Sequence, residues 1–138
     1  MSVKIEKFIL ATKGFDEVID ITSKVNDIVS YVSSKEGLVN IFVQSSTASI
    51  LILEDEPALS SDLAKLLENI VPINKIYQHD NTWHDGNAYA HLKSILLGNS
   101  LTLPVHDSKV ALGLYQQIVL LDFDNKASEK EIIISVVS

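Results

Sequence analysis

The chain has 138 residues, a formal net charge of −7, 46% hydrophobic residues and 21% charged residues, which is typical of one compact domain over residues 1–138. It lacks cysteine and arginine, which excludes disulfides and sulfur-ligated metals and leaves lysine, backbone amides or a metal to hold an anion. No basic run, secretory signal or membrane-length apolar segment is present, so we expect a soluble cytoplasmic protein that binds neither nucleic acid nor membrane.

The N-terminal part of the sequence predicts a strand, a turn and a helix. Residues Val3 to Ala11 alternate between polar and apolar side chains, as in a strand, and a turn follows at Lys13-Gly14. Asp20 to Thr22 offer caps for a helix that ends within Ser33 to Gly37. The apolar residues of this helix recur at helical spacing and are predicted to be buried: Val25, Ile28, Val29 and Val32.

The middle of the sequence predicts two strands and a second helix. The branched residues of Leu38 to Gln44 and of Thr47 to Leu53 favour strands. Acidic residues and Pro57 then mark the start of a helix that Pro72 ends, because acidic side chains match the positive end of the helix dipole. The predicted buried stripe of this helix consists of Leu59, Leu63, Leu66, Leu67 and Ile70.

The C-terminal part predicts a third helix and a run of strands. The helix covers Ala88 to Leu97 and ends at Gly98. Its predicted apolar face consists of Ala88, Leu92, Ile95 and Leu96. The predicted strands are Ser100 to Val105, Lys109 to Gly113, Tyr115 to Phe123 and Glu131 to Val137. This order of elements favours an α+β fold with largely antiparallel sheets.

The segment from His79 to His91 is the strongest candidate for chemistry, because histidines occur there among carboxylates and amides. Imidazole titrates near neutral pH and is a common metal ligand, so such a group can bind a metal or move protons. Asp85 and Asn87 could orient the imidazoles. The same residues are also typical of the capped start of a helix, in which His91 would be a half-buried residue without a chemical role. His84 and His106 are expected in loops, also without one.

A set of short motifs runs along nearly the whole chain in a specific order. They are Ile41-Phe42-Val43, Ser46-Thr47-Ala48, Glu54, Asp62, His79, Asp85-Gly86-Asn87, His91-Leu92-Lys93, Leu97-Gly98-Asn99-Ser100, Pro104-Val105, Leu112-Gly113, Gln116 and Ile118. In these motifs the chain resembles the YjbQ-like family, small proteins often described as secondary thiamine-phosphate synthases. The resemblance implies sheets packed as a sandwich with about three helices, a homotrimer, and a polar pocket near the subunit contacts.

The resemblance also implies the residues of the site. Its catalytic residues would be His79, His91, Asp85 and Asn87. A divalent metal, zinc or magnesium, would be held by His79, Asp85 and His91. The implied ligand-binding residues are Lys93, Ser45, Ser46, Thr47, Glu54 and Gln116.

The chain departs from the family pattern at several of these positions. Ser45 stands where the family has a histidine, and Ser46 replaces a threonine. Leu53 stands where the family often has asparagine, and Asp124 to Glu131 lacks the usual arginines. Serine is a poor metal ligand, so we expect weaker binding of metal and phosphate than in a three-histidine site.

The implied activity transfers a pyrimidine-methyl group from its diphosphate to thiazole phosphate, giving thiamine phosphate and pyrophosphate. The leaving diphosphate needs positive charge or a metal, for which His79, His91 and Lys93 are candidates. The departures keep open a second hypothesis, a non-catalytic trimer that binds a small anion or phosphorylated metabolite. A hydrolase that uses metal-bound water is a third.

Overall fold

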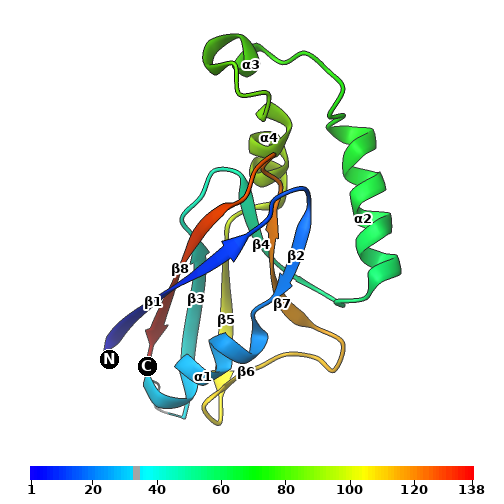
Figure 1. The fold of residues 1–138 in the computed structure, drawn as a ribbon. Coiled ribbons are helices and arrows are strands. Elements are labelled where there is room, and N and C mark those ends of the chain that lie inside the picture. Colours follow the sequence, from blue (N-terminus) through cyan, green and yellow to red (C-terminus); the bar gives the residue numbers. More distant parts are fainter. Residues whose placement is uncertain (33–34) are drawn as a thin grey trace.

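The computed structural model describes residues 1–32 and 35–138, which form two antiparallel sheets and four α-helices (Figure 1). The five-stranded sheet has the strand order β1 (Val3–Thr12), β8 (Ser128–Val137), β3 (Gly37–Val43), β5 (Ser100–His106) and β6 (Lys109–Val110). The three-stranded sheet has the order β2 (Glu17–Asp20), β7 (Gln117–Asp122) and β4 (Ala48–Leu53). The predicted α+β class with antiparallel sheets is confirmed.

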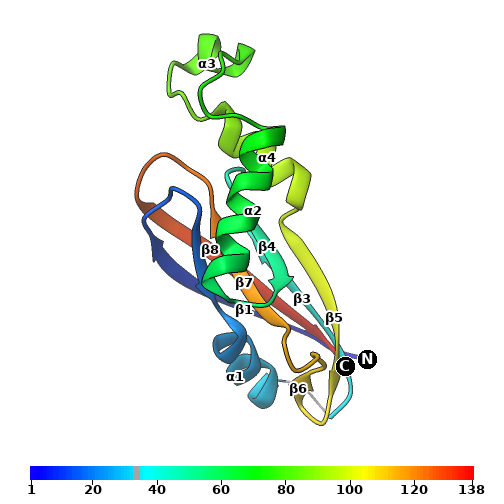
Figure 2. The ribbon, with the colours of Figure 1, turned by 90° about the vertical axis from the view of Figure 1, so that its right-hand side faces the viewer.

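The two sheets enclose the larger hydrophobic core. β7 contributes Ile118 and Leu120 to it, and β8 contributes Ile132 and Ile134. Helix α1 (Thr22–Val32) packs at one end of the sandwich (Figure 2). Its predicted buried residues, Val25, Ile28, Val29 and Val32, are all buried in this core. The predicted end of this helix includes residues 33 and 34, which lie outside the described residues.

A smaller core lies on the opposite face of the three-stranded sheet, under helices α2 (Pro57–Ile70) and α4 (Ala88–Leu97). Val119 and Leu121 alternate along β7 with the residues of the larger core and pack with Leu67 and Ala90. Because successive side chains of a strand point to opposite faces, β7 serves both cores. The three-stranded sheet is therefore the middle layer between a larger sheet and a helical layer.

Helix α2 begins where the acids and the proline predict it. The Glu56 carboxylate accepts hydrogen bonds of 2.9 Å from the backbone N–H groups of Ala58 and Leu59, which caps the helix. The prediction of a broad buried stripe was wrong, because Leu67 is the one buried residue of this helix and Leu59, Leu66 and Ile70 are exposed. The helix lies on the outside of the molecule and contacts the smaller core along a narrow line.

Two short elements carry no sequence signal that predicts them. β2 has four residues and is defined by its pairing with β7. Helix α3 (Gln78–Trp83) is the helix that the sequence did not predict, and its six residues have no apolar periodicity. β6 is shorter than the predicted strand and ends at Val110. Among the described residues, no helix has the length and hydropathy to cross a membrane.

Candidate functional site

The chain reversal between α3 and α4 brings two of the predicted site residues together. Helix α3 protrudes beyond the N-terminal end of α4 (Figures 1 and 2). It ends at His84, which has left-handed backbone angles with φ of 57°. The chain then turns into α4, so that the rings of His79 and His91 lie 4.5 Å apart between centroids, tilted by 48°.

Two carboxylates lie beside His79. Its Nδ1 atom is 3.7 Å from Asp85 Oδ1 and 3.9 Å from Asp80 Oδ1, which is too long for hydrogen bonds. This Nδ1 is buried and has no hydrogen-bond partner. Ligand atoms of His79, Asp80 and Asp85 lie within 4.8 Å of one another. One imidazole nitrogen and two carboxylates around an unpartnered atom fit a divalent cation.

This carboxylate–histidine group differs in one member from the predicted metal ligands. The His91 ring lies against that of His79, but His91 does not belong to the close group of ligand atoms, whereas Asp80 does. Asp80 also accepts a 3.2 Å hydrogen bond from the backbone N–H of Ala88, at the start of α4. The sequence did not predict Asp80 as a ligand, because the residues of α3 were expected to form a loop. The position of Asp80 directly after His79 could have indicated that it belongs to the site.

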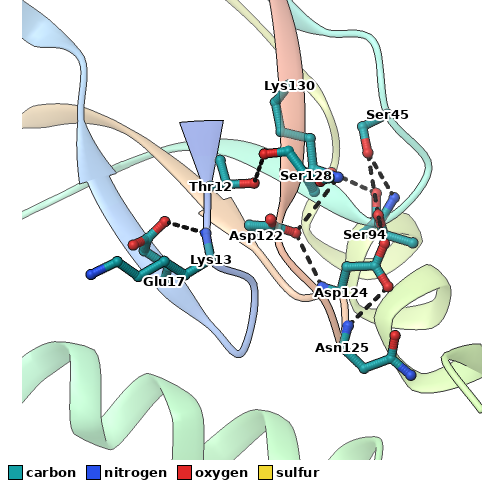
Figure 3. Close-up of polar contacts among 12 residues, drawn as sticks. Thr12, Lys13, Glu17, Ser45, Ser94, Asp122, Asp124, Asn125, Ser128 and Lys130 are labelled. Carbon is teal, nitrogen blue, oxygen red and sulfur yellow. Dashed lines mark hydrogen bonds and ion pairs between the residues drawn. The ribbon is translucent and has the colours of Figure 1, made fainter. Parts of the chain in front are cut away.

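The structure places Asn87 in a buried polar network around Asp124. Figure 3 shows Asp124 in this network together with Asp122, Asn125 and Lys130. Its amide donates a 3.2 Å hydrogen bond to Asp124 Oδ1, and the Thr47 hydroxyl donates one of 3.3 Å to Asp124 Oδ2. Burial alone would raise the pKa of Asp124. The hydrogen bonds from Asn87, Asn125 and Thr47, with the nearby charge of Lys130, outweigh burial and lower this pKa.

The network also reaches the histidine segment from a second side. Asp122 Oδ1 accepts from the backbone N–H of Asp124 and lies 3.8 Å from the Lys130 ammonium. The Asn125 amide donates a 2.8 Å hydrogen bond to the backbone carbonyl of Asp85. The connection between β7 and β8 therefore holds both the turn at Asp85 and Asn87, the residue that precedes α4. Sequence reasoning identified neither Asp124 nor Asn125 as part of the site.

Two hollows meet at His91. The first, which we call the apolar hollow, is lined by His79, Tyr77, Leu92 and Ile95 among others and holds about 600 Å³, including space open to solvent. The second, the polar hollow, holds about 480 Å³ on the same basis. It is lined by Ser46, His91, Ser94, Ile95, Gly98 and Asn99. The structure thus brings the predicted residues Ser46 and His91 to one surface depression.

The prediction of which face of α4 is buried was wrong. Ala88 is buried as predicted, but Leu92, Leu96 and especially Ile95, which is 76% exposed, face outward. The inward face instead carries small and polar residues. The Ser94 hydroxyl donates a 2.7 Å hydrogen bond to the Ala48 carbonyl, which lets α4 pack close to β4. An apolar pattern alone does not reveal such a polar contact.

Lys93 lies apart from the histidines. Its side chain is 1% exposed, and its ammonium is 3.2 Å from Asp16 Oδ1. The ammonium also lies 5.5 Å from the ring centroid of Tyr89 and 5.6 Å from that of Phe123. Its charge is therefore used inside the protein, between α4 and the turn that precedes β2.

The other predicted ligand-binding residues divide into two groups. Ser45 lies near Asp124, with its Oγ 3.3 Å from the Thr47 hydroxyl. Glu54 and Gln116 are exposed at the far end of β4 and β7. Five strand residues separate that end from Ala48, which corresponds to about 17 Å. The structure does not bring these two residues to the histidines.

The remaining histidines lie outside the cleft between α3 and α4 that contains His79 and His91. His84 is exposed at the end of α3. His106 is exposed at the hairpin between β5 and β6, and its Nδ1 is 2.9 Å from Glu36 Oε1. The hydrogen bond and charge of Glu36 raise the pKa of His106. Glu36, His106 and Asp107 form a second group of potential metal ligands, but all three are exposed to solvent.

The fold and the histidine–carboxylate cleft define a small α+β sandwich protein, and comparisons with known proteins place it in a family. Residues 6–138 match the family described as UPF0047 protein YjbQ-like. A UPF0047 protein of Archaeoglobus fulgidus is 41% identical over 117 residues, covering 85% of this chain and 89% of the relative. One of Methanothermobacter thermautotrophicus is 35% identical, with 94% and 90% covered. The chain belongs to the UPF0047, or YjbQ-like, family.

Solved structures support the same assignment. A YbjQ-like protein of unknown function from Sulfolobus solfataricus P2 has a TM-score of 0.86 at 30% identity, with 98% of each chain covered. A hypothetical protein from Aeropyrum pernix K1 has a TM-score of 0.89 at 27% identity, also with 98% of each chain covered. The arrangement of two sheets and helices is therefore shared along almost the entire chain.

Proposed function

We propose that the protein binds a divalent cation, zinc or magnesium, in the cleft between α3 and α4 and acts there on a small phosphorylated metabolite. The observation that carries this proposal is the buried, unpartnered Nδ1 of His79, which faces Asp80 and Asp85. A cation held by these three residues would supply the positive charge that a phosphorylated substrate requires. Lys93 does not supply this charge, because it is paired with Asp16.

The activity that we propose is the transfer implied by the family resemblance, which forms thiamine phosphate and pyrophosphate. His91 lies in contact with His79 and lines both hollows, so its imidazole is placed to donate or accept a proton at a bound substrate. Asp85 and Asn87 support this arrangement from the turn before α4. Lys75 adds a positive charge beside the cleft, with its ammonium 5.5 Å from the ring centroid of Tyr77.

A second candidate function is binding of a small anion or metabolite without turnover. Two observations favour it. Ser45 replaces the family histidine and contacts Thr47, and Lys93 is turned into the interior. A site that has serine at position 45 and in which Lys93 is paired with Asp16 has fewer groups to stabilise a leaving diphosphate.

Isothermal titration with zinc and with magnesium tests the metal site. The titrations should use protein that carries His106→Ala, so that the exposed group at the β5–β6 hairpin does not contribute. In that background, we expect His79→Ala to weaken cation binding by about tenfold or more. His84→Asn is the matched control, because it removes a neighbouring imidazole and retains a residue that tolerates left-handed angles. Equal affinities with and without His79 would contradict the proposed site.

An activity assay separates the two candidate functions. Purified protein is supplied with the pyrimidine diphosphate, the thiazole phosphate and a divalent metal, and formation of thiamine phosphate is followed. We expect turnover that His91→Ala abolishes, while circular dichroism shows the variant to be folded. Unchanged turnover in this variant would reject the assigned role of His91. Saturable binding of the two precursors without product would instead identify a binding protein.

A further inference from the structure

We infer that the apolar hollow and the polar hollow form one bipartite site for a substrate with an uncharged apolar ring or short chain and an uncharged hydrogen-bonding group. His91 and Ile95 line both hollows, so the hollows are adjacent on the surface of α4, and one small molecule that lies across these two side chains would contact both. The inference rests on the proposed function, in which the cation holds the phosphorylated end of the substrate. It specifies the chemical nature of the rest of the substrate, which the cation would not contact.

The apolar hollow offers surfaces for a ring or a short alkyl chain. Leu92 and Ile95 form one wall and are exposed to solvent on the surface of α4. Tyr77 lies at the other side, and its hydroxyl donates a 2.7 Å hydrogen bond to the Pro72 carbonyl. This hydroxyl donates its proton within the protein, so it has none to donate to an occupant of the hollow. Covering these side chains with an apolar group would be favourable.

The polar hollow offers hydrogen-bonding groups that have no partner of their own. Within the described part of the chain, the side chains of Ser46 and Asn99 make no hydrogen bond. The Ser94 hydroxyl already donates to Ala48 but retains an acceptor site. A hydroxyl or primary amide can both donate to and accept from this set.

Charge selects between uncharged and anionic occupants. Among the described residues that line the two hollows, none is lysine, aspartate or glutamate. The carboxylates of Asp80 and Asp85 lie beside His79, at one end of the apolar hollow. Lys75, whose ammonium lies 5.5 Å from the ring centroid of Tyr77, lines neither hollow. A free anion would therefore gain no ion pair with a residue that lines the hollows and would meet negative charge at the His79 end.

The test uses three small probes on metal-free protein, followed by ¹H–¹⁵N nuclear magnetic resonance. Phenylacetamide has a ring and an uncharged amide, phenylacetate has the same ring with a carboxylate, and acetamide has the amide alone. We expect phenylacetamide to shift the amide signals of His91, Ile95 and Asn99 together. It should bind about tenfold more tightly than either of the other probes, which corresponds to about 1.4 kcal/mol.

Two variants assign the binding to the two hollows. Ile95→Lys should weaken phenylacetamide binding by about tenfold through the apolar hollow, and Asn99→Ala should weaken it several-fold through the polar hollow. Leu66→Lys, at an exposed position on α2, is the matched control and should leave binding unchanged. Circular dichroism checks that each variant is folded.

Three results would overturn the inference. They are binding of phenylacetate as tight as that of phenylacetamide, signal shifts restricted to one hollow, and unchanged binding in Ile95→Lys. Because the probes are applied without metal, failure of the proposed metal site leaves this test intact. Wild-type protein that binds phenylacetamide but no cation would overturn the proposed function and support the bipartite site.

Discussion

Asp124 is a single buried carboxylate that fixes three parts of the protein relative to one another. Its oxygens accept hydrogen bonds from Asn87 before α4, from Thr47 before β4 and from Asn125 after β7. These donors favour the charged form strongly enough that the pKa of Asp124 falls despite burial. The negative charge of this residue is thus part of the native structure.

We predict that Asp124→Asn lowers the free energy of unfolding at pH 7 by about 1–3 kcal/mol, because several buried donors lose a charged acceptor. A lowered pKa in the folded state gives stability that is complete above the ordinary carboxylate pKa of about 4. That stability is lost as the pH falls through the folded-state pKa. Urea unfolding of both proteins from pH 7 to pH 3 should show the difference shrinking in acid.

Asp27→Asn is the control for this experiment, because Asp27 is exposed on α1. It should change stability by less than about 0.5 kcal/mol at either pH. A difference between wild-type protein and Asp124→Asn that stayed constant down to pH 3 would contradict the role assigned to the Asp124 charge.

At the level of residues, the sequence predicted part of the candidate site. Histidines and carboxylates within thirteen positions of one another (79–91) indicated a site, and His79, Asp85 and His91 do lie together. Asp80 was missed because its position depends on the short helix α3. Asp124 was missed because it lies in the connection between β7 and β8, far away in sequence. Local spacing does not reveal a contact between such distant segments.

Helix α4 shows the same limit at the level of elements. Its bounds follow from sequence, since Asn87 precedes the first helical residue and Gly98 follows the last. Its orientation does not, because counting apolar residues at helical spacing puts Leu92 and Ile95 inward. In the structure, Lys93 and Ser94 face inward, held by Asp16 and by the Ala48 carbonyl. Polar contacts override the apolar pattern there.

We predict that the pair between Lys93 and Asp16 is sensitive to which partner is changed. Asp16→Asn leaves a buried ammonium without its counter-ion and should cost about 3 kcal/mol of unfolding free energy. Lys93→Met keeps an apolar chain between the Tyr89 and Phe123 rings and should cost less than about 1.5 kcal/mol. Chemical denaturation of both variants provides the comparison.

Lys65→Met, at an exposed position on α2, is the matched control for loss of a lysine charge. We expect it to have little effect on the denaturation midpoint. A larger loss of stability in Lys93→Met than in Asp16→Asn would show that the ion pair itself, and not the burial of an unpaired charge, sets the energetics.

At the scale of the whole molecule, one sheet face is uncovered. Val3, Ile5 and Ile9 of β1 are each more than half exposed, and Leu38 of β3 is almost half exposed. Of the described elements, the helices and the smaller sheet all pack against the other side. Apolar side chains on an open sheet face favour association with other copies of the chain.

We predict that the protein forms a homotrimer through this face. Light scattering after size-exclusion chromatography should give three times the chain mass of 15.2 kDa. Ile5→Lys together with Ile9→Lys should shift the mass toward that of one chain, because a charge would be buried at each contact. Leu66→Lys, at an exposed position on α2, should leave the mass unchanged. A single-chain mass for wild-type protein would contradict the prediction.

Strand β7 lies between both hydrophobic cores, since Ile118 and Leu120 belong to one and Val119 and Leu121 to the other. Loss of either core would therefore remove the apolar contacts on one face of this strand. We therefore expect the two cores to unfold together. The amide protons of β7 should then exchange with solvent through unfolding of the whole domain, so that their exchange rates measure the global free energy of unfolding.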